Sequence, residues 1–178
     1  MLNFLIALTN LCWGSWGIFD KKALDGSQPR AVLLIQYALA LPEFVIVLII
    51  LMCSGPHRIV DLPLAVFWSG LGAVTSALAM LAYMGAMSRA EASYVLGITA
   101  SYPLVMQLLA AIFLGESIVG NRMFGSALIG AGVFLVGRSE IAAEGNKPAH
   151  FNHLVLFCII VATFGWGVHG LFDKKAVG

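Results

Sequence analysis

Aromatic, acidic and basic side chains lie close together near the start of the chain. If residues 2–22 form a helix, Trp13, Trp16 and Asp20 fall within an arc of about 60°, and Lys21 lies on the adjoining arc. A carboxylate near a membrane normally faces protein or a water-filled cavity, so this stripe is a candidate binding site for a polar substrate. The alternative is an aromatic belt at the membrane interface, with Asp20 and Lys21 marking the membrane surface.

A second acidic residue, Glu43, stands within an apolar segment directly after Pro42. A carboxylate at the centre of a membrane costs about 2.5–3.5 kcal/mol on insertion scales, so it should be protonated, paired or in contact with water. Gln36 lies seven residues earlier and shares a helix face with Glu43. Two interpretations follow: Glu43 couples substrate movement to protons or contacts the substrate, or it is a neutral structural acid that is hydrogen-bonded between helices.

Hydroxyl groups surround a proline farther along the chain. Pro103 has no N–H to donate, so in a helix it frees the carbonyl of Thr99, beside Ser101 and Tyr102. Exposed backbone and hydroxyls near the middle of a membrane suit a polar ligand, which makes Ser101 and Tyr102 candidate substrate-binding residues. The alternative is a packing kink whose backbone groups are satisfied by Ser and Thr.

Long segments without charge must position these side chains. The 178-residue chain is 60% apolar and 11% charged, whereas a soluble domain carries about 25% charged residues. So few charges cannot cover a water-facing surface, and a helix needs about 20 apolar residues to cross a membrane. The gaps between charges predict an all-α integral membrane protein, a helical bundle with six spans near 2–22, 31–53, 64–87, 93–115, 120–137 and 152–173.

A repeated segment relates the first predicted span to the last. The eleven residues Trp13–Ala23 match Trp166–Ala176 at eight positions without a gap. Five spans separate the starts of the two copies, and an odd number of crossings turns the second copy upside down, as in the inverted repeats of secondary transporters. The two helices should be antiparallel, with the first tryptophan of each copy facing a shared cavity. The repeat adds Trp166, His169 and Asp173 to the candidate substrate-binding residues.

The repeat also divides the chain into unequal parts. Residues 1–137 are predicted to form a first five-helix repeat, 138–151 a polar linker, and 152–178 the first helix of a second repeat. By this interpretation the second repeat is truncated, and the chain is a fragment or a truncated product. We then expect it to associate with another copy of itself or with a missing second half.

Other classes of function lack the residues that they require. Ten basic residues meet nine acidic ones, so the chain has no field of positive charge for nucleic acid. No P-loop, G-x-S-x-G, H-E-x-x-H or C-x-x-C motif occurs. His169 and Asp173 have the spacing H-x-x-x-D, but the first copy has Trp16 in place of His169, which argues against catalysis. We therefore expect neither an enzyme nor a bound cofactor or metal.

A further pattern lies in the fourth and fifth predicted spans. Residues 92–103 read Ala-Ser-Tyr-Val-Leu-Gly-Ile-Thr-Ala-Ser-Tyr-Pro, and Leu114-Gly-Glu116, Gly125 and Gly130-Ala-Gly132 follow them. In this order the motifs resemble those of the EamA-type branch of the drug/metabolite transporter superfamily, which the Trp-Gly motif of the first span also fits. The resemblance implies ten helices in two inverted five-helix repeats, with a central substrate cavity and alternating access. It implies no particular substrate.

The sequence therefore predicts a secondary active transporter, or permease, that moves a small organic metabolite or drug across the cell membrane by alternating access. Its expected partners are the lipid bilayer, a small-molecule substrate and, if Glu43 is the coupling group, protons. The alternative is a non-transporting membrane assembly subunit or scaffold produced by truncation. Measurements of solute flux separate the two.

Overall fold

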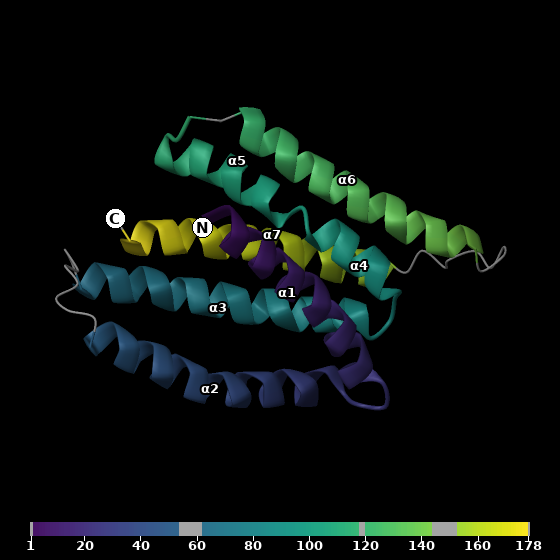
Figure 1. The fold of residues 1–178 in the computed structure, drawn as a ribbon, viewed down its shortest axis with the longest axis horizontal. Coiled ribbons are helices and arrows are strands. Elements are labelled where there is room, and N and C mark those ends of the chain that lie inside the picture. Colours follow the sequence, from purple (N-terminus) through teal and green to yellow (C-terminus); the bar gives the residue numbers. More distant parts are fainter. Residues whose placement is uncertain (1, 54–61, 118–119, 144–152, 178) are drawn as a thin grey trace.

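Helices form the regular structure in the computed structural model, which describes residues 2–53, 62–117, 120–143 and 153–177. Seven helices follow one another along these segments (Figure 1): α1 (Leu2–Leu24), α2 (Pro29–Cys53), α3 (Leu62–Met87), α4 (Ala92–Thr99), α5 (Tyr102–Leu114), α6 (Gly120–Ala143) and α7 (His153–Val177). No strand occurs within these ranges. The predicted all-helical fold is confirmed, with one helix more than expected because the fourth predicted span is divided.

Several helical segments are long and apolar enough to cross a membrane. Among the described residues there are four: Pro29–Ile46, Leu62–Met87, Ala92–Leu114 and His153–Ala176. A shorter apolar stretch, Met123–Gly132, lies within α6. The predicted spans 2–22 and 120–137 are helical, as α1 and the first part of α6, and are not among these four segments.

Large apolar side chains are exposed along the outer helices. Leu39 and Phe44 of α2 and Ile112 of α5 are each more than 60% exposed. Such side chains need no cover in hydrocarbon, and a helix satisfies its own backbone hydrogen bonds there. Together with the apolar spans, this exterior defines a multi-span membrane protein.

The fourth predicted span is interrupted beside its proline. α4 ends at Thr99 and α5 begins at Tyr102, with the proline in its first turn. The Thr99 hydroxyl donates to the carbonyl of Val95 at 2.8 Å, and the Ser101 hydroxyl donates to the carbonyl of Ile98 at 2.6 Å. Hydroxyls that bond to nearby carbonyls are typical of a structural kink in a membrane helix.

α7 lies at the centre of the bundle, between α3 and α5 (Figure 1). Its most extensive contacts are with α3, followed by those with α5. Glycines permit this approach, because a Cβ added at Gly165 would lie 2.8 Å from the Cβ of Ala79, and one added at Gly167 would lie 2.6 Å from Cγ1 of Val105. Small residues let membrane helices pack closely. The last predicted span is therefore the core of the described bundle.

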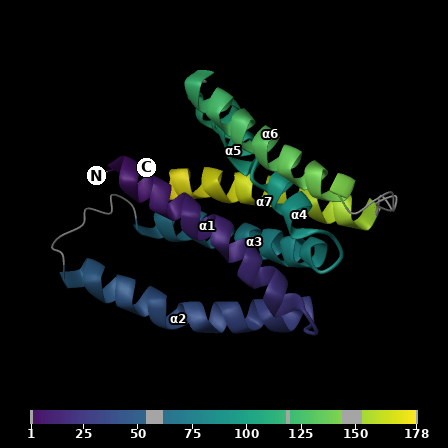
Figure 2. The same cartoon turned by 45° about the vertical axis from the view of Figure 1, so that its right-hand side comes forward.

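α1 crosses the bundle obliquely and contacts α3 and α4, whereas α2 lies at the edge and packs chiefly on α3. The N and C labels lie at the same end of the molecule in both views, so α1 and α7 run in opposite directions (Figures 1 and 2). This is the direction that the odd number of predicted crossings requires. The antiparallel arrangement of the two repeat copies is therefore confirmed.

Candidate functional site

Asp20 is the most deeply buried charged residue in the described structure, with an exposed fraction of 1%. It lies in the last turns of α1, where the side chain of Gln36 from α2 donates from Nε2 to its Oδ1. The other carboxylate oxygen, Oδ2, has no hydrogen-bond partner among the described residues. The described part of the structure contains two ion pairs, and neither of them includes Asp20. A buried acid of this kind is costly unless another group completes its environment.

Two aromatic side chains approach the same carboxylate. The indole of Trp16 comes from the preceding turn of α1, and the hydroxyl of Tyr83 comes from α3. Tyr83 is 3% exposed, and its ring centroid lies 5.3 Å from that of Trp166 on α7. The ring centroid of Tyr102 also lies close to Trp166, at 6.1 Å from its ring centroid. Tyr83 thus connects the acid of the first repeat copy to the tryptophan of the second.

Tyr83 was not among the predicted candidates, although it contacts two of them, Asp20 and Trp166. Within 62–87 it is a polar group in an otherwise largely apolar segment, which is a weak signal that packing alone also explains. Gln36 was expected to share a helix face with Glu43, whose side chain lies outside the described structure, and the structure adds that the Gln36 side chain binds Asp20. Contacts between different helices decided both outcomes, and helical periodicity carries no information about them.

A groove of about 460 Å³ lies beside Asp20, between α1 and α2. Its lining includes Trp16, Phe19 and Asp20 from α1, and Ile35, Gln36 and Leu39 from α2. The volume falls within the range of about 300–1,000 Å³ that small-molecule sites occupy. The groove is largely apolar, with its polar groups gathered at the hydrogen-bonded side chains of Asp20 and Gln36.

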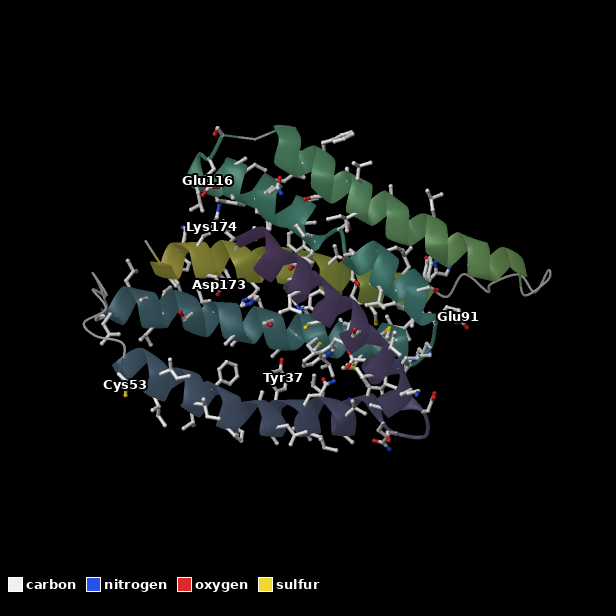
Figure 3. All side chains as sticks on the ribbon, viewed as in Figure 1. Tyr37, Cys53, Glu91, Glu116, Asp173 and Lys174 are labelled. Carbon is white, nitrogen blue, oxygen red and sulfur yellow. The ribbon has the colours of Figure 1, made fainter. Side chains whose placement is uncertain are left out.

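The polar residues of the second repeat copy lie elsewhere, against α3. Nε2 of His169 lies 3.3 Å from Oδ2 of Asp173, one helical turn away. A Cβ added at Gly72 of α3 would lie 3.1 Å from an atom of each, and Figure 3 shows Asp173 between α7 and α3. Nδ1 of His169 is buried and has no partner among the described groups. The acid of this copy therefore has a polar side-chain neighbour on its own helix.

The lysines that follow the two acids are engaged by other parts of the chain. Nζ of Lys21 donates to the backbone carbonyls of Met87 and Ala90, at 2.8 and 2.9 Å. These carbonyls lie at the end of α3 and just beyond it, where helix carbonyls lack partners and a cation is favourable. Lys174 pairs with Glu116, which lies just after α5, as Figure 3 shows.

The remaining candidates are not gathered at Asp20. A Cβ added at Gly130 of α6 would lie 3.4 Å from the Cβ of Ser101, so Ser101 lies at the contact of that helix with the kink. The side chains of Trp13 and Glu43 lie outside the described part of the structure. No group of three or more His, Cys, Asp or Glu residues that could hold a metal occurs in the part that is described.

The apolar helices define a multi-span membrane protein, and its buried acid is linked through Tyr83 of α3 to the second copy of the repeat. Residues 1–138 match the model of the EamA-like transporter family, and the chain belongs to that family. It is therefore a membrane transporter of the drug/metabolite superfamily, with the lipid bilayer and a small molecule as partners. The match ends before α7, which the internal repeat alone relates to α1. No curated protein and no solved structure matches the chain.

Proposed function

We propose that the chain acts as a secondary active transporter that moves a small organic metabolite or drug across the cell membrane by alternating access. The observation that carries this proposal is the buried carboxylate of Asp20, next to a groove and in contact through Tyr83 with the second repeat copy. Membrane helices tolerate such a group where it faces a cavity or a substrate path. Family membership supports the same function.

The arrangement of the two repeat copies supports alternating access. α1 and α7 are antiparallel, and rocking of one inverted repeat against the other is a common way to open a central site to each side in turn. Tyr83 contacts groups on both helices, Asp20 on α1 and Trp166 on α7. A movement of α1 relative to α7 therefore changes the surroundings of the buried acid.

Within this proposal the substrate-binding residues are Trp16, Asp20, Tyr102 and Trp166. They form a connected set through Tyr83, whereas Lys21 and Ser101 bind backbone carbonyls and His169 and Asp173 bind each other. We assign supporting roles in helix packing to these other four residues, Lys21, Ser101, His169 and Asp173.

The test is solute flux through the purified chain in liposomes. Vesicles are incubated with a mixture of small organic metabolites, and their contents are identified by mass spectrometry. We expect at least one solute to accumulate saturably above the level in protein-free liposomes. The Asp20→Asn variant should lose this uptake, while Asp25→Asn, the same change in the exposed turn after α1, should retain it. Uptake no greater than in protein-free vesicles for every solute would contradict the proposal and favour a non-transporting subunit.

We propose proton coupling through Glu43, on the ground of its position within an apolar span. Glu43→Gln preserves shape while removing titration, so uptake driven by a pH gradient should disappear while counterflow exchange survives. Both are measured in the same proteoliposomes once a solute is identified. An unchanged response to the gradient would remove Glu43 from the mechanism.

A further inference from the structure

Two hydrogen-bond acceptors beside the groove between α1 and α2 have no hydrogen-bond partner among the described residues, although Trp16 and Tyr83 lie near one of them. They are Oδ2 of Asp20 and Oε1 of Gln36, which belong to side chains already joined by a hydrogen bond. Both atoms are buried, and both residues line the groove. A buried acceptor without a donor costs free energy comparable to a lost hydrogen bond, and more when it is charged. The unpaired atoms therefore mark the place of a missing donor.

The charge of the site also indicates that a hydrogen-bond donor is missing. The carboxylate of Asp20 has no cation paired with it in the described structure, because the neighbouring ammonium of Lys21 is held by two backbone carbonyls. When Asp20 is ionised, each of the two unpaired atoms can accept a hydrogen bond and neither can donate one. A ligand that completes the site must therefore bring positive charge and at least two N–H groups.

The walls of the groove suit the organic part of such a ligand. Trp16 and Phe19 are 51% and 70% exposed, so their rings are available for contact, and Ile35 and Leu39 form the apolar wall opposite. Aromatic faces attract ammonium groups, and apolar walls favour an alkyl or aryl substituent. A volume of about 460 Å³ accommodates a molecule of this size.

Resting on the proposed transport function, we infer that this groove binds a primary ammonium compound with an apolar substituent. The ammonium group donates to Oδ2 of Asp20 and Oε1 of Gln36, and the substituent lies between Trp16 and Leu39. A quaternary ammonium lacks the N–H groups, and an alcohol lacks the charge. The site therefore selects primary amines over both.

The experiment measures equilibrium binding to the purified full-length chain in nanodiscs, with empty nanodiscs as the baseline. The probe is radiolabelled 2-phenylethylammonium, with 2-phenylethanol and phenyltrimethylammonium as competitors. We expect saturable binding of the probe, with each competitor weaker by about tenfold or more, because one bond to a charged group is worth at least that factor. Competition by the alcohol or the quaternary ion at equal strength would overturn the selectivity.

Variants of the chain separate the groups that bind. Asp20→Asn should weaken binding of the probe by about tenfold or more, and Gln36→Met by a smaller factor, because it removes a neutral acceptor. The matched control, Asp25→Asn, makes the same change in an exposed turn and should bind as the unmodified chain does. Size-exclusion profiles of the variants establish that they are folded, and Gln36→Met keeps the test valid if Asp20→Asn does not fold.

The outcomes distinguish this inference from the transport function itself. Saturable uptake of metabolites by a preparation that does not bind the probe overturns the amine site and leaves transport standing. Probe binding that requires Asp20, in a preparation without any flux, supports the amine site and contradicts transport. Equal binding by Asp20→Asn and the unmodified chain shows that a proton neutralises this acid, and it overturns the inference.

Discussion

The two copies of the segment from the first tryptophan to the paired lysines share eight of eleven residues, yet their acids stand in different environments. Asp20 is 1% exposed and lacks a cationic partner in the described structure, whereas the side chain of Asp173 is 54% exposed and lies 3.3 Å from His169. The residue one turn earlier also differs, because Trp16 occupies the position of His169. The acid of α7 thus has a side-chain partner on its own helix, whereas the acid of α1 binds Gln36 of α2.

The helices that carry the copies also occupy different positions. α7 lies between α3 and α5, and its glycines approach rigid atoms such as the Cβ of Ala79. α1 lies outside this core, and a Cβ added at Gly17 would meet the tip of the Leu96 side chain at 2.5 Å. A shared sequence therefore serves as a packing core in one copy and as a wall of a groove in the other.

The largest expected effect tests the difference between the two acids. Asp20→Asn should lower the initial rate of solute uptake in proteoliposomes by about tenfold or more, because it removes an acceptor of charge-assisted hydrogen bonds. Asp173→Asn should lower the rate by about threefold or less, since the histidine beside it already satisfies the acid. Equal losses in the two variants would show that the copies act symmetrically, contrary to the environments described above.

A variant that exchanges the preceding residue sharpens this comparison. In the chain with Trp16→His, the new imidazole lies one turn before Asp20, as His169 does before Asp173. The imidazole can pair with the acid, so binding of an ammonium probe should weaken further as pH falls and the imidazole becomes charged. The measurement is the affinity for the probe at pH 6 and pH 8. An affinity equal to that of the unmodified chain at both pH values would show that Trp16 is not part of the binding site.

The next effect concerns the glycines of the two helices. Gly167→Ala should lower the free energy of unfolding by about 1–3 kcal/mol, because the new methyl group meets Val105 and the backbone nitrogen of Met106. Gly17→Ala meets only the end of a leucine side chain, which can change rotamer, and should cost less than about 1 kcal/mol. Denaturation of the purified variants in detergent measures both. A larger loss for Gly17→Ala would contradict the central position of α7.

The smallest effects concern the lysines after the two acids. Lys21→Met removes two bonds to carbonyls at the end of α3 and should destabilise the chain by about 1.5 kcal/mol. Lys174→Met removes an exposed ion pair with Glu116 and should cost at most about 1 kcal/mol. Thermal unfolding at low and high salt is the measurement.

Salt provides the control for the lysine comparison. Screening weakens an exposed ion pair, so the difference between Lys174→Met and the unmodified chain should shrink at 1 M salt, where the screening length is about 3 Å. The effect of Lys21→Met should change less, because its partners are neutral carbonyls. A salt-dependent loss in Lys21→Met alone would contradict the assigned bonds.

Local patterns in the sequence were sufficient for the helices and their directions. Gaps between charges predicted spans within a few residues of α2, α3 and α7, because a bilayer rejects charge over a fixed length. The proline after Tyr102 predicted a kink within the fourth span, since a residue without an N–H interrupts the helix ladder, and the structure divides the span there into α4 and α5. The odd number of crossings between the repeat copies predicted that α1 and α7 are antiparallel. Each of these constraints acts within one segment or on the count of segments.

Only the tertiary structure decided which side chains meet. Three contacts depend on how separate helices are rotated and spaced. Gln36 binds Asp20, Tyr83 joins Asp20 to Trp166, and Lys21 binds a carbonyl of α3. The position of α7 also depends on tertiary packing, because its glycines lie against side chains of α3 and α5 such as Ala79 and Val105. Membrane helices are apolar on all faces, so no amphipathic pattern marks the inward side, and packing chooses the rotation that brings a buried acid to its partners.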